Sequence, residues 1–275
     1  MTITDDTGRK VTIDKEPQKI VSLAPSNTEI LFALGLGENV VGVTDFCDYP
    51  AEAKTKPKMG GIKPSLEKIV ATQPDLVLAI AETAGAPEIA TKLESLNVKV
   101  IVLGPKNLDD IMASIKLVGQ AAGRDDQAAI LVADIKSKVD GVIAKAKTAT
   151  SKPRVMYELD ATDPAKPYTP GPGSFMDALI GMAGGSNIAA DAKMQWAQLS
   201  LEEVVKKDPE IIILGDANYG VTPDQVKQRP GWSNVTAVKN GNVKPIDDNL
   251  VSRPGPRIGD GLEALAKLIH PELFP

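Results

Sequence analysis

Histidine and cysteine are nearly absent from this sequence, which has one of each among 275 residues. A single cysteine excludes an internal disulfide framework, and without a second histidine no histidine-rich zinc or manganese site can form. Basic residues are also in deficit, because 31 Lys and Arg face 36 Asp and Glu and leave a net charge of −5. Nucleic-acid-binding chains usually carry a basic face that neutralises phosphates, so we expect no nucleic-acid partner.

Catalytic and membrane-spanning signatures are missing as well. No apolar run approaches the ~18 residues of a membrane span, and there is no Gly-x-Ser-x-Gly elbow or Walker phosphate loop. The segments Gly35-Leu-Gly37 and Gly171-Pro-Gly173 lack the third glycine of a dinucleotide-binding loop. The lone His270 suits the carboxyl end of the last helix, and Cys47 suits a packed loop better than a reactive or metal-binding thiol. We therefore expect neither catalytic residues nor a bound metal.

The rest of the composition is ordinary. With 43% hydrophobic and 24% charged residues, the chain has the balance of a soluble globular protein rather than a disordered one. Its length suggests about two domains at ~100–200 residues each. Residues 2–19 are polar and contain no basic-then-apolar signal peptide, which fits either a cytosolic protein or a mature secreted domain without its leader.

Strand and helix patterns alternate in the first half of the chain. Apolar and polar residues alternate over Thr2–Ile13 and predict a β-hairpin. Ser26 and Glu29 have the spacing of a capping box, which predicts a helix over Ile30–Leu34 that ends at the following glycines. Further helices are predicted near Ser65 and Pro87, and strands at Ile20–Ala24, Val40–Val43, Asp75–Ile80 and Val98–Leu103. This order is typical of a parallel sheet with helices on both faces.

The middle of the chain differs. Strand patterns stop between Asn107 and Thr148, where the spacing predicts a short helix and, after Asp125, one long helix. A strand at Arg154–Leu159 resumes the alternation. The sequence thus predicts an α/β fold in which two lobes with parallel sheets are joined by a single long, rigid α-helix. The predicted lobes are residues 1–123 and 151–275, with the helix in residues 124–150.

The two halves also contain a repeated segment. Residues 65–78, SLEKIVATQPDLVL, recur as residues 200–213, SLEEVVKKDPEIII. Residues 34–40 and 182–188 match more weakly, in the same order. Helix capping and strand initiation would explain one such segment, but two copies in matching order favour duplicated lobes.

Glu67 and Glu202 are the acidic residues shared by the two copies. The helix dipole explains an acid in a first helical turn, but it does not explain a matched pair with one member per lobe. Two such carboxylates are suited to dock a two-fold symmetric partner through its arginines. In the predicted architecture they are too far apart for paired acid–base chemistry.

Aromatic residues are few, only 4% of the chain, and six of the ten fall on predicted loops: Phe46, Tyr49, Tyr168, Trp196, Tyr219 and Trp232. Those loops follow strands, where an open α/β sheet binds its ligand, and a cleft between lobes is another favoured place. We predict an aromatic-lined cleft for a large, partly apolar ligand. Tyr219 and Trp232 are expected to pack their own loops, whereas Tyr49, Tyr168 and Trp196 are expected to face the ligand.

A stiff loop with two arginines precedes the last predicted helix, in the segment Ser252-Arg-Pro-Gly-Pro-Arg-Ile258. Arg253 or Arg257 would suit an anionic group of a ligand, and each would equally suit hydrogen bonds that tie the loop to the body. Both interpretations stay open, and Arg257, which directly precedes the helix, is the better candidate for the structural role.

The ordered set of motifs resembles a known family. Pro17–Gly35 is similar to the opening of the substrate-binding proteins of ABC importers for vitamin B12, siderophores and haem. The segments that also match, in order, are Asp48-Tyr-Pro50, Ser65-Leu-Glu67, Pro74-Asp75 and Arg253-Pro-Gly-Pro-Arg257. The resemblance covers essentially the whole chain. It implies two Rossmann-like lobes bridged by one long helix, with a ligand between them and no enzymatic activity.

Within the family the chain looks most similar to cobalamin binders. Asp48-Tyr49-Pro50 and Lys166-Pro-Tyr168 match segments that carry pocket aromatics, and Gln195–Ser200 matches a segment that carries the pocket tryptophan, here Trp196. The chain departs from the pattern at Gly60-Gly61, where cobalamin binders have a tryptophan, and this leaves more room for a different ligand. The resemblance implies a corrinoid ligand contacted by Phe46, Tyr49, Gly61, Tyr168, Trp196 and Arg257.

The resemblance also implies the partner and the compartment. Glu67 and Glu202 match the glutamates that dock onto the arginines of a permease dimer. The protein is expected to be a monomer outside the cytoplasmic membrane, either periplasmic or lipid-anchored. Haem, held by Tyr49 or Tyr168, and a ferric siderophore remain alternative ligands. A cytosolic α/β enzyme with a cleft active site is the alternative from another class.

Overall fold

The computed structural model describes residues 1–81 and 85–274. The chain divides into two compact units. Unit 1 comprises Met1–Ile135 and Pro254–Pro256, and unit 2 comprises Lys136–Arg253 and Arg257–Pro275. No helix of the described part of the chain has the length and apolar character needed to cross a membrane.

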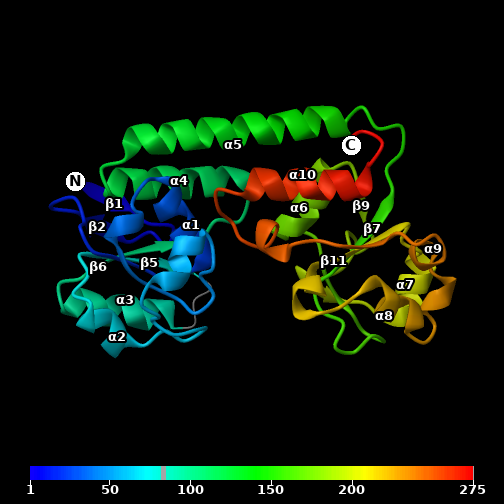
Figure 1. Ribbon diagram of the computed structural model, residues 1–275, viewed down its shortest axis with the longest axis horizontal. Helices are drawn as coiled ribbons and strands as arrows, with labels where there is room; N and C mark the ends of the chain where they lie inside the picture. Colours follow the sequence, from blue (N-terminus) through cyan, green and yellow to red (C-terminus); the bar gives the residue numbers. More distant parts are fainter. Residues whose placement is uncertain (82–84, 275) are drawn as a thin grey trace. The chain divides into compact units, whose positions relative to one another are not determined.

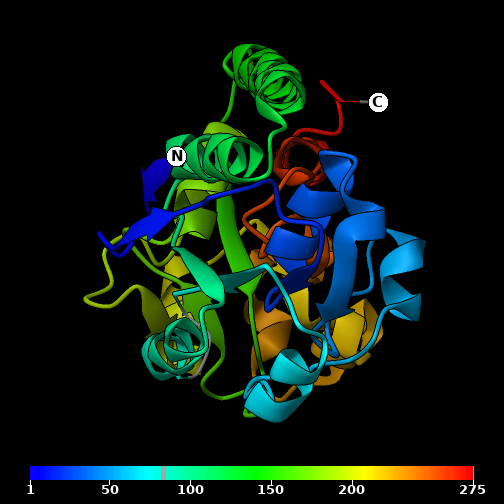
Figure 2. The ribbon, with the colours of Figure 1, turned by 90° about the vertical axis from the view of Figure 1, so that its left-hand side faces the viewer.

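Unit 1 is built on a four-stranded parallel sheet with the strand order β4-β3-β5-β6. The strands are β3 (Ile20–Ser22), β4 (Val40–Val43), β5 (Leu76–Ile80) and β6 (Lys99–Leu103). They can be followed from blue to cyan in Figure 1 and Figure 2. The central strand β5 reads LVLAI and is apolar throughout, as expected of a parallel strand covered on both faces.

The helices of unit 1 are α1 (Pro25–Ala33), α2 (Leu66–Ala71), α3 (Ala86–Ser95) and α4 (Leu108–Ala121), with short 3-10 turns at η1 (Gly37–Asn39) and η2 (Ala51–Thr55). Ile69 of α2 and Leu93 of α3 pack in one core cluster with Val77 of β5. Helix α1 instead contacts α4. The apolar face of each helix packs into the core, and this packing fixes the position of the loops that join the helices to the strands.

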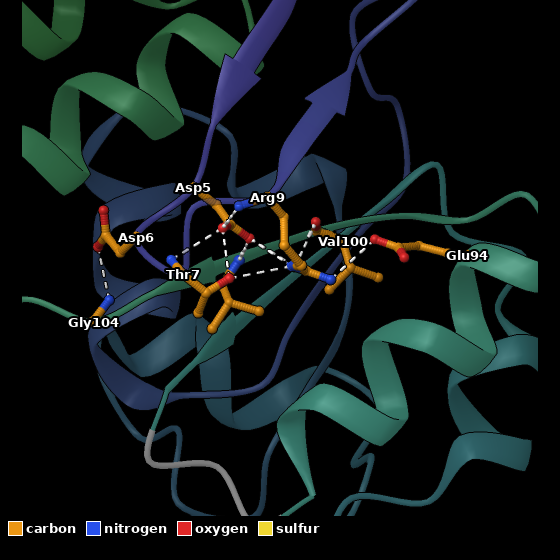
Figure 3. A network of polar contacts seen from close by, with 8 residues as sticks. Asp5, Asp6, Thr7, Arg9, Glu94, Val100 and Gly104 are labelled. Atoms are coloured by element: carbon orange, nitrogen blue, oxygen red, sulfur yellow. Dashed lines mark hydrogen bonds and ion pairs between the residues drawn. The ribbon is translucent and has the colours of Figure 1, made fainter.

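A hairpin of β1 (Thr2–Thr4) and β2 (Lys10–Thr12) covers the outer edge of this sheet. The buried Asp5 carboxylate accepts hydrogen bonds from Thr7 and Arg9 (Figure 3) and also from the Val102 backbone N–H of β6. Burial alone would raise the pKa of Asp5, but the hydrogen bonds from Thr7, Arg9 and Val102 outweigh it and lower that pKa. The network closes an edge that would otherwise be open to strand addition.

Unit 2 repeats the parallel sheet with the order β12-β11-β7-β9. Its strands are β7 (Arg154–Glu158), β9 (Ser186–Asn187), β11 (Ile211–Leu214) and β12 (Val243–Pro245). A separate antiparallel pair consists of β8 (Tyr168–Pro170) and β10 (Trp196–Gln198). Helices and 3-10 turns connect them: α6 (Phe175–Met182), α7 (Leu201–Lys207), η3 (Gly215–Tyr219), α8 (Pro223–Gln228), η4 (Trp232–Asn234), α9 (Thr236–Lys239), η5 (Asp248–Leu250) and α10 (Ile258–Ile269).

The long predicted helix is present as α5 (Asp125–Ala146), which carries the chain from unit 1 into unit 2. Within unit 2, its Lys138 forms ion pairs with Asp260 and Glu263 of α10. These two partners raise the pKa of Lys138, so the lysine stays charged at neutral pH. The predicted α/β class with two parallel sheets is confirmed.

Two local predictions were wrong. Helix α1 begins at Pro25, with Ala24 in the N-cap position, so Ser26 lies inside the first turn and forms no capping box with Glu29. Proline at the first helical position is the signal that decides this start, because its fixed φ suits the helix and its missing N–H costs nothing there. Tyr168 and Trp196 lie on short strands rather than on loops.

Candidate ligand-binding and docking residues

The loop after β4 presents two of the predicted aromatics. Phe46 and Tyr49 are about half exposed, whereas Cys47 between them is buried. The Cys47 Sγ lies 3.1 Å from the hydroxyls of Thr28 and Thr44, so the thiol points into unit 1, in agreement with the expected packed cysteine. Because the Cys47 side chain packs inside unit 1, the nearby Phe46 and Tyr49 side chains face the solvent.

Gly61 lies beside the Phe46 ring. A side-chain carbon built on Gly61 would be 3.4 Å from Cζ of Phe46, which is ordinary contact distance. The backbone N–H of Asp45 donates to the Gly60 carbonyl at 2.9 Å and holds the two segments together. The space expected from the absence of a large side chain at position 61 is therefore bordered by the Phe46 ring.

The antiparallel pair β8–β10 presents the other two aromatics. Trp196 pairs with Pro170 and Gln198 pairs with Tyr168, so both aromatic side chains are on the same face of the pair. Both are exposed, at 43% for Tyr168 and 48% for Trp196, while Thr169 and Ala197 on the opposite face are buried. The alternation of a strand thus places a tyrosine and a tryptophan together on a solvent-facing surface of unit 2.

The remaining two loop aromatics of unit 2 behave differently from each other. Trp232 is fully buried and its Nε1 donates to the Pro164 carbonyl at 3.0 Å, which confirms its predicted packing role. Tyr219 is 86% exposed, so the prediction that it packs its own loop was wrong. It ends η3, directly after β11, and Gly220 follows it with φ of +94°, which turns the chain away at once. Tyr219 joins the exposed aromatics of unit 2.

Glu67 and Glu202 occupy the second position of α2 and α7, as the repeat predicts. Ser65 caps α2 by accepting from the Lys68 N–H, and Ser200 caps α7 in a full capping box with Glu203. Glu67 and Glu202 are both exposed. Among residues 1–81 and 85–274, neither carboxylate has a hydrogen-bond or ion-pair partner. Both therefore remain available to an external cation.

Arg257 occupies the N-cap position of α10, and its carbonyl accepts from the Gly261 N–H at 3.0 Å. Its side chain and that of Arg253 are partly buried. A side-chain carbon built on Gly255 between them would lie at an ordinary contact distance, 3.5 Å, from Cα of Ser26 in α1, and residues 254–256 belong to unit 1. Which of the two predicted roles each arginine has therefore stays a prediction.

Sequence reasoning missed a buried ionic cluster in unit 2. Glu158 ends β7 and accepts both Arg229 nitrogens, at 2.6 and 2.8 Å, while Arg229 also stacks on Trp232. Asp216 follows β11 and is 4% exposed, and neither of its oxygens has a hydrogen-bond donor among the described residues. Burial, together with the negative charge of Glu158, raises the pKa of Asp216 to about 7.

No grouping of three or more metal-ligating side chains occurs in the residues that the structure describes. The buried His270 lies just past the end of α10, where it was expected, and its ring nitrogens contact Glu272 and the Gly184 carbonyl. The cluster of Glu158, Asp216 and Arg229 instead consists of two neighbouring buried carboxyls and one guanidinium, which is bonded to Glu158 alone.

Known proteins resemble this chain over nearly its whole length. A family model described as a periplasmic binding protein matches residues 20–250. YvrC, an uncharacterized ABC transporter substrate-binding lipoprotein of Bacillus subtilis, is 38% identical over all of this chain and 87% of its own length. A cobalamin-binding protein of Halobacterium salinarum is 31% identical over 97% of this chain and 73% of its own length.

A solved structure extends the likeness to the fold. The periplasmic haem-binding protein RhuT of Roseiflexus, in its apo form, matches with a TM-score of 0.83 and 30% identity, over 92% of this chain and 98% of that one. The matched family segment includes the aromatic residues, Gly61 and both repeated glutamates.

Proposed function

The chain belongs to the periplasmic binding protein family that serves ABC importers, and from this premise we propose that it captures cobalamin or a related corrinoid and delivers it to a permease. The family consists of non-catalytic, extracytoplasmic binding proteins, so this chain is one of them and not a cytosolic enzyme. The observation that carries the choice of ligand is the set of half-exposed aromatics, Phe46 and Tyr49 in unit 1 and Tyr168 and Trp196 in unit 2.

Exposed rings on ordered segments are suited to a flat, partly apolar ligand. Each ring buries a large apolar area when it is covered, so leaving four of them in water sacrifices stabilisation that a ligand restores. The Trp196 and Tyr168 strands are paired, and the Phe46 loop is hydrogen-bonded to Gly60, so little ordering is needed on binding. The corrin macrocycle matches these surfaces, and the cobalamin-binding relative supports this choice.

Haem is the second candidate, since a haem-binding protein shares the fold at 30% identity. The iron would need a protein ligand, and His270 is buried and engaged with Glu272 and Gly184. Tyr49 and Tyr168 are the exposed alternatives. A ferric siderophore would rely instead on Arg253 or Arg257 against its anionic chelate.

Titration of the purified protein with cyanocobalamin, haemin and a ferric siderophore tests the proposal. We expect stoichiometric retention of the corrin absorbance after gel filtration and quenching of tryptophan fluorescence. The chain has two tryptophans, and Trp196→Phe should abolish most of the quenching, because Trp232 is buried. Retention of haem with a tyrosinate-to-iron charge-transfer band, and not of the corrinoid, would contradict the corrinoid proposal.

We also propose that Glu67 and Glu202 dock the protein onto arginines of the permease dimer. Their exposure, their lack of partners in the described chain and their duplication support this role. The double variant Glu67→Gln with Glu202→Gln should lose transport while it retains the corrinoid. Glu52→Gln, at another exposed glutamate of unit 1, is the matched control and should behave as the wild type.

A further inference from the structure

Helices α2 and α7 share a second exposed feature besides their glutamates. Val70 and Val205 occupy the same position of the repeated segment, and each is 36% exposed. Their neighbours Ile69 and Val204 are completely buried and fix the inner face of each helix. A single exposed valine is common on protein surfaces. The same exposed valine at the same place in both units is not explained by packing within either unit.

Each valine lies on the same helical face as the docking glutamate. Residues three apart in an α-helix are neighbours on its surface, and the pairs Glu67–Val70 and Glu202–Val205 both have this spacing. The serine caps at Ser65 and Ser200 order the first turn that carries each glutamate. Each unit therefore presents an unpartnered carboxylate with an apolar side chain one turn further along.

The repeat also preserves the way each helix ends. Gln73 and Asp208 occupy matching positions before a proline and both have positive φ, +49° and +43°, a conformation that is unusual for residues other than glycine. Keeping a strained exit in both copies keeps the same residues of each helix facing outward. The two surfaces are thus duplicated in sequence, in exposure and in local backbone.

We propose that Glu67 with Val70, and Glu202 with Val205, form two copies of a bipartite docking surface for the permease dimer. Each carboxylate pairs with a guanidinium of one permease subunit, and each valine enters a small apolar pocket one helical turn away. A dimeric partner offers the same pocket twice, which matches the duplication. The valine contact excludes water beside the ion pair and so strengthens it, as neighbours of hot-spot residues do in protein interfaces. This inference rests on the proposed docking function of the glutamates.

The test uses the full chain and its cognate permease–ATPase complex in nanodiscs. Affinity for the complex is measured for the wild type, for Val70→Ser with Val205→Ser, and for Glu67→Gln with Glu202→Gln, at low and high salt. Ile130→Ser, at an apolar residue of α5 that is 64% exposed, is the matched control. Cyanocobalamin affinity is measured on each variant to verify that the corrinoid site and the fold are intact.

We expect the valine double variant to bind the permease about tenfold more weakly, which corresponds to ~1.4 kcal/mol. Each single valine variant should account for roughly threefold, because the two surfaces are equivalent. The valine effect should persist at high salt, whereas the glutamate effect should shrink as the ion pairs are screened. Every variant should keep the wild-type affinity for cyanocobalamin, and Ile130→Ser should also keep the wild-type affinity for the permease complex.

The outcomes separate this inference from the proposed function. If the glutamate variant binds the permease weakly while the valine variant binds like the wild type, the valine contact is wrong and the docking role of the glutamates stands. If neither variant weakens the complex, both proposals fail. Loss of cyanocobalamin binding in the valine variant would assign Val70 and Val205 a structural role and overturn the docking inference.

Discussion

The two units share a frame and differ in what is added to it. In each, the acid that follows the repeated proline ties two neighbouring strands together: Asp75 accepts from the backbone N–H groups of Gln18 and Lys19, and Glu210 accepts from that of Arg154. Helices α1 and α6 end alike, with Gly35 and Gly184 at positive φ. These shared features lie in the sheet and its helix ends.

The added parts are specific to each unit. Unit 1 has the β1–β2 hairpin with its Asp5–Arg9 network, in which both oxygens of the Asp5 carboxylate accept hydrogen bonds. Unit 2 has the β8–β10 pair with Tyr168 and Trp196, and the buried carboxyl pair of Glu158 and Asp216. Under the proposed roles, the duplicated frame serves docking, which needs two equal surfaces, and the divergent additions serve ligand recognition and local stability.

The largest contrast is expected between the two buried acid–arginine pairs. Arg229→Met leaves the completely buried Glu158 charge without its partner, so we expect a loss of about 3–5 kcal/mol in the free energy of unfolding. Arg9→Met should cost only about 1–2 kcal/mol, because Asp5 keeps its hydrogen bonds from Thr7 and Val102. Urea denaturation of both variants measures the difference. Equal losses would contradict the contrast between the two units.

The divergent strands of unit 2 should matter for the ligand and not for docking. Trp196→Ala removes a ring that is half exposed, so folding loses little, while affinity for cyanocobalamin should fall roughly 30- to 100-fold, or about 2–3 kcal/mol. Permease binding should stay unchanged. Tyr219→Ala, at a more exposed aromatic on a different segment, shows whether any exposed ring has this effect or only those on β8 and β10.

Asp216 should give unit 2 a pH dependence of the opposite sign to that of Asp5 in unit 1. Because the folded-state pKa of Asp216 is raised to about 7, its stabilising contribution is complete below the unfolded-state pKa near ~4 and is lost as the pH rises to 7. The pKa of Asp5 is lowered, so its contribution is present above ~4 and is lost in acid.

Asp216→Asn tests this directly, since an amide has nearly the shape of a carboxyl group but cannot titrate. Compared with the variant, the wild type should lose on the order of 4 kcal/mol of unfolding free energy between pH 4 and pH 8. Arg229, Tyr157 and Asp248 also face the cluster and remain in both proteins. A difference that stays constant with pH would show that Asp216 is ionised throughout.

The smallest effect on the free energy of unfolding is expected at Asp75 and Glu210, the acids that follow the repeated proline in the two units. Asp75→Asn should cost about 1 kcal/mol and Glu210→Gln somewhat less, because Asp75 accepts two backbone N–H groups and Glu210 accepts one. Backbone hydrogen bonds from Gln18 and Lys19 outweigh the effect of burial and lower the pKa of Asp75. Thermal unfolding of the two variants should reproduce this ranking if the frame is equivalent in both units.

Much of the frame could be predicted because its signals are local. Apolar runs such as LVLAI indicate buried strands, and the spacing after Asp125 indicates the long helix α5. The start of α1 was misplaced because two N-terminal signals compete there, and Pro25 prevails over Ser26. Tyr168 and Trp196 were not predicted to lie on strands, because strands of three residues give too little alternation of apolar and polar residues to detect.

The ionic cluster could not be predicted. Glu158, Asp216 and Arg229 are separated by up to 71 residues, and only the parallel pairing of β7 with β11 brings the two carboxyls to one sheet edge. The exposure of Glu67 and Glu202 follows from the capped helices, yet their role remains a prediction, as do those of Phe46, Tyr49, Gly61, Tyr168, Trp196 and Arg257.

Because Cys47 is buried, the reactivity of its thiol measures how often the loop that carries Phe46 and Tyr49 opens. It is the only thiol in the chain, and it lies between the hydroxyls of Thr28 and Thr44, adjacent to Phe46. A thiol reagent can reach it only when the loop opens, so the rate of labelling measures how often that happens. A ligand that rests on Phe46 and Tyr49 would slow the labelling of Cys47. Cysteines introduced elsewhere on the surface would react before Cys47, so Cys47 would not need to be removed.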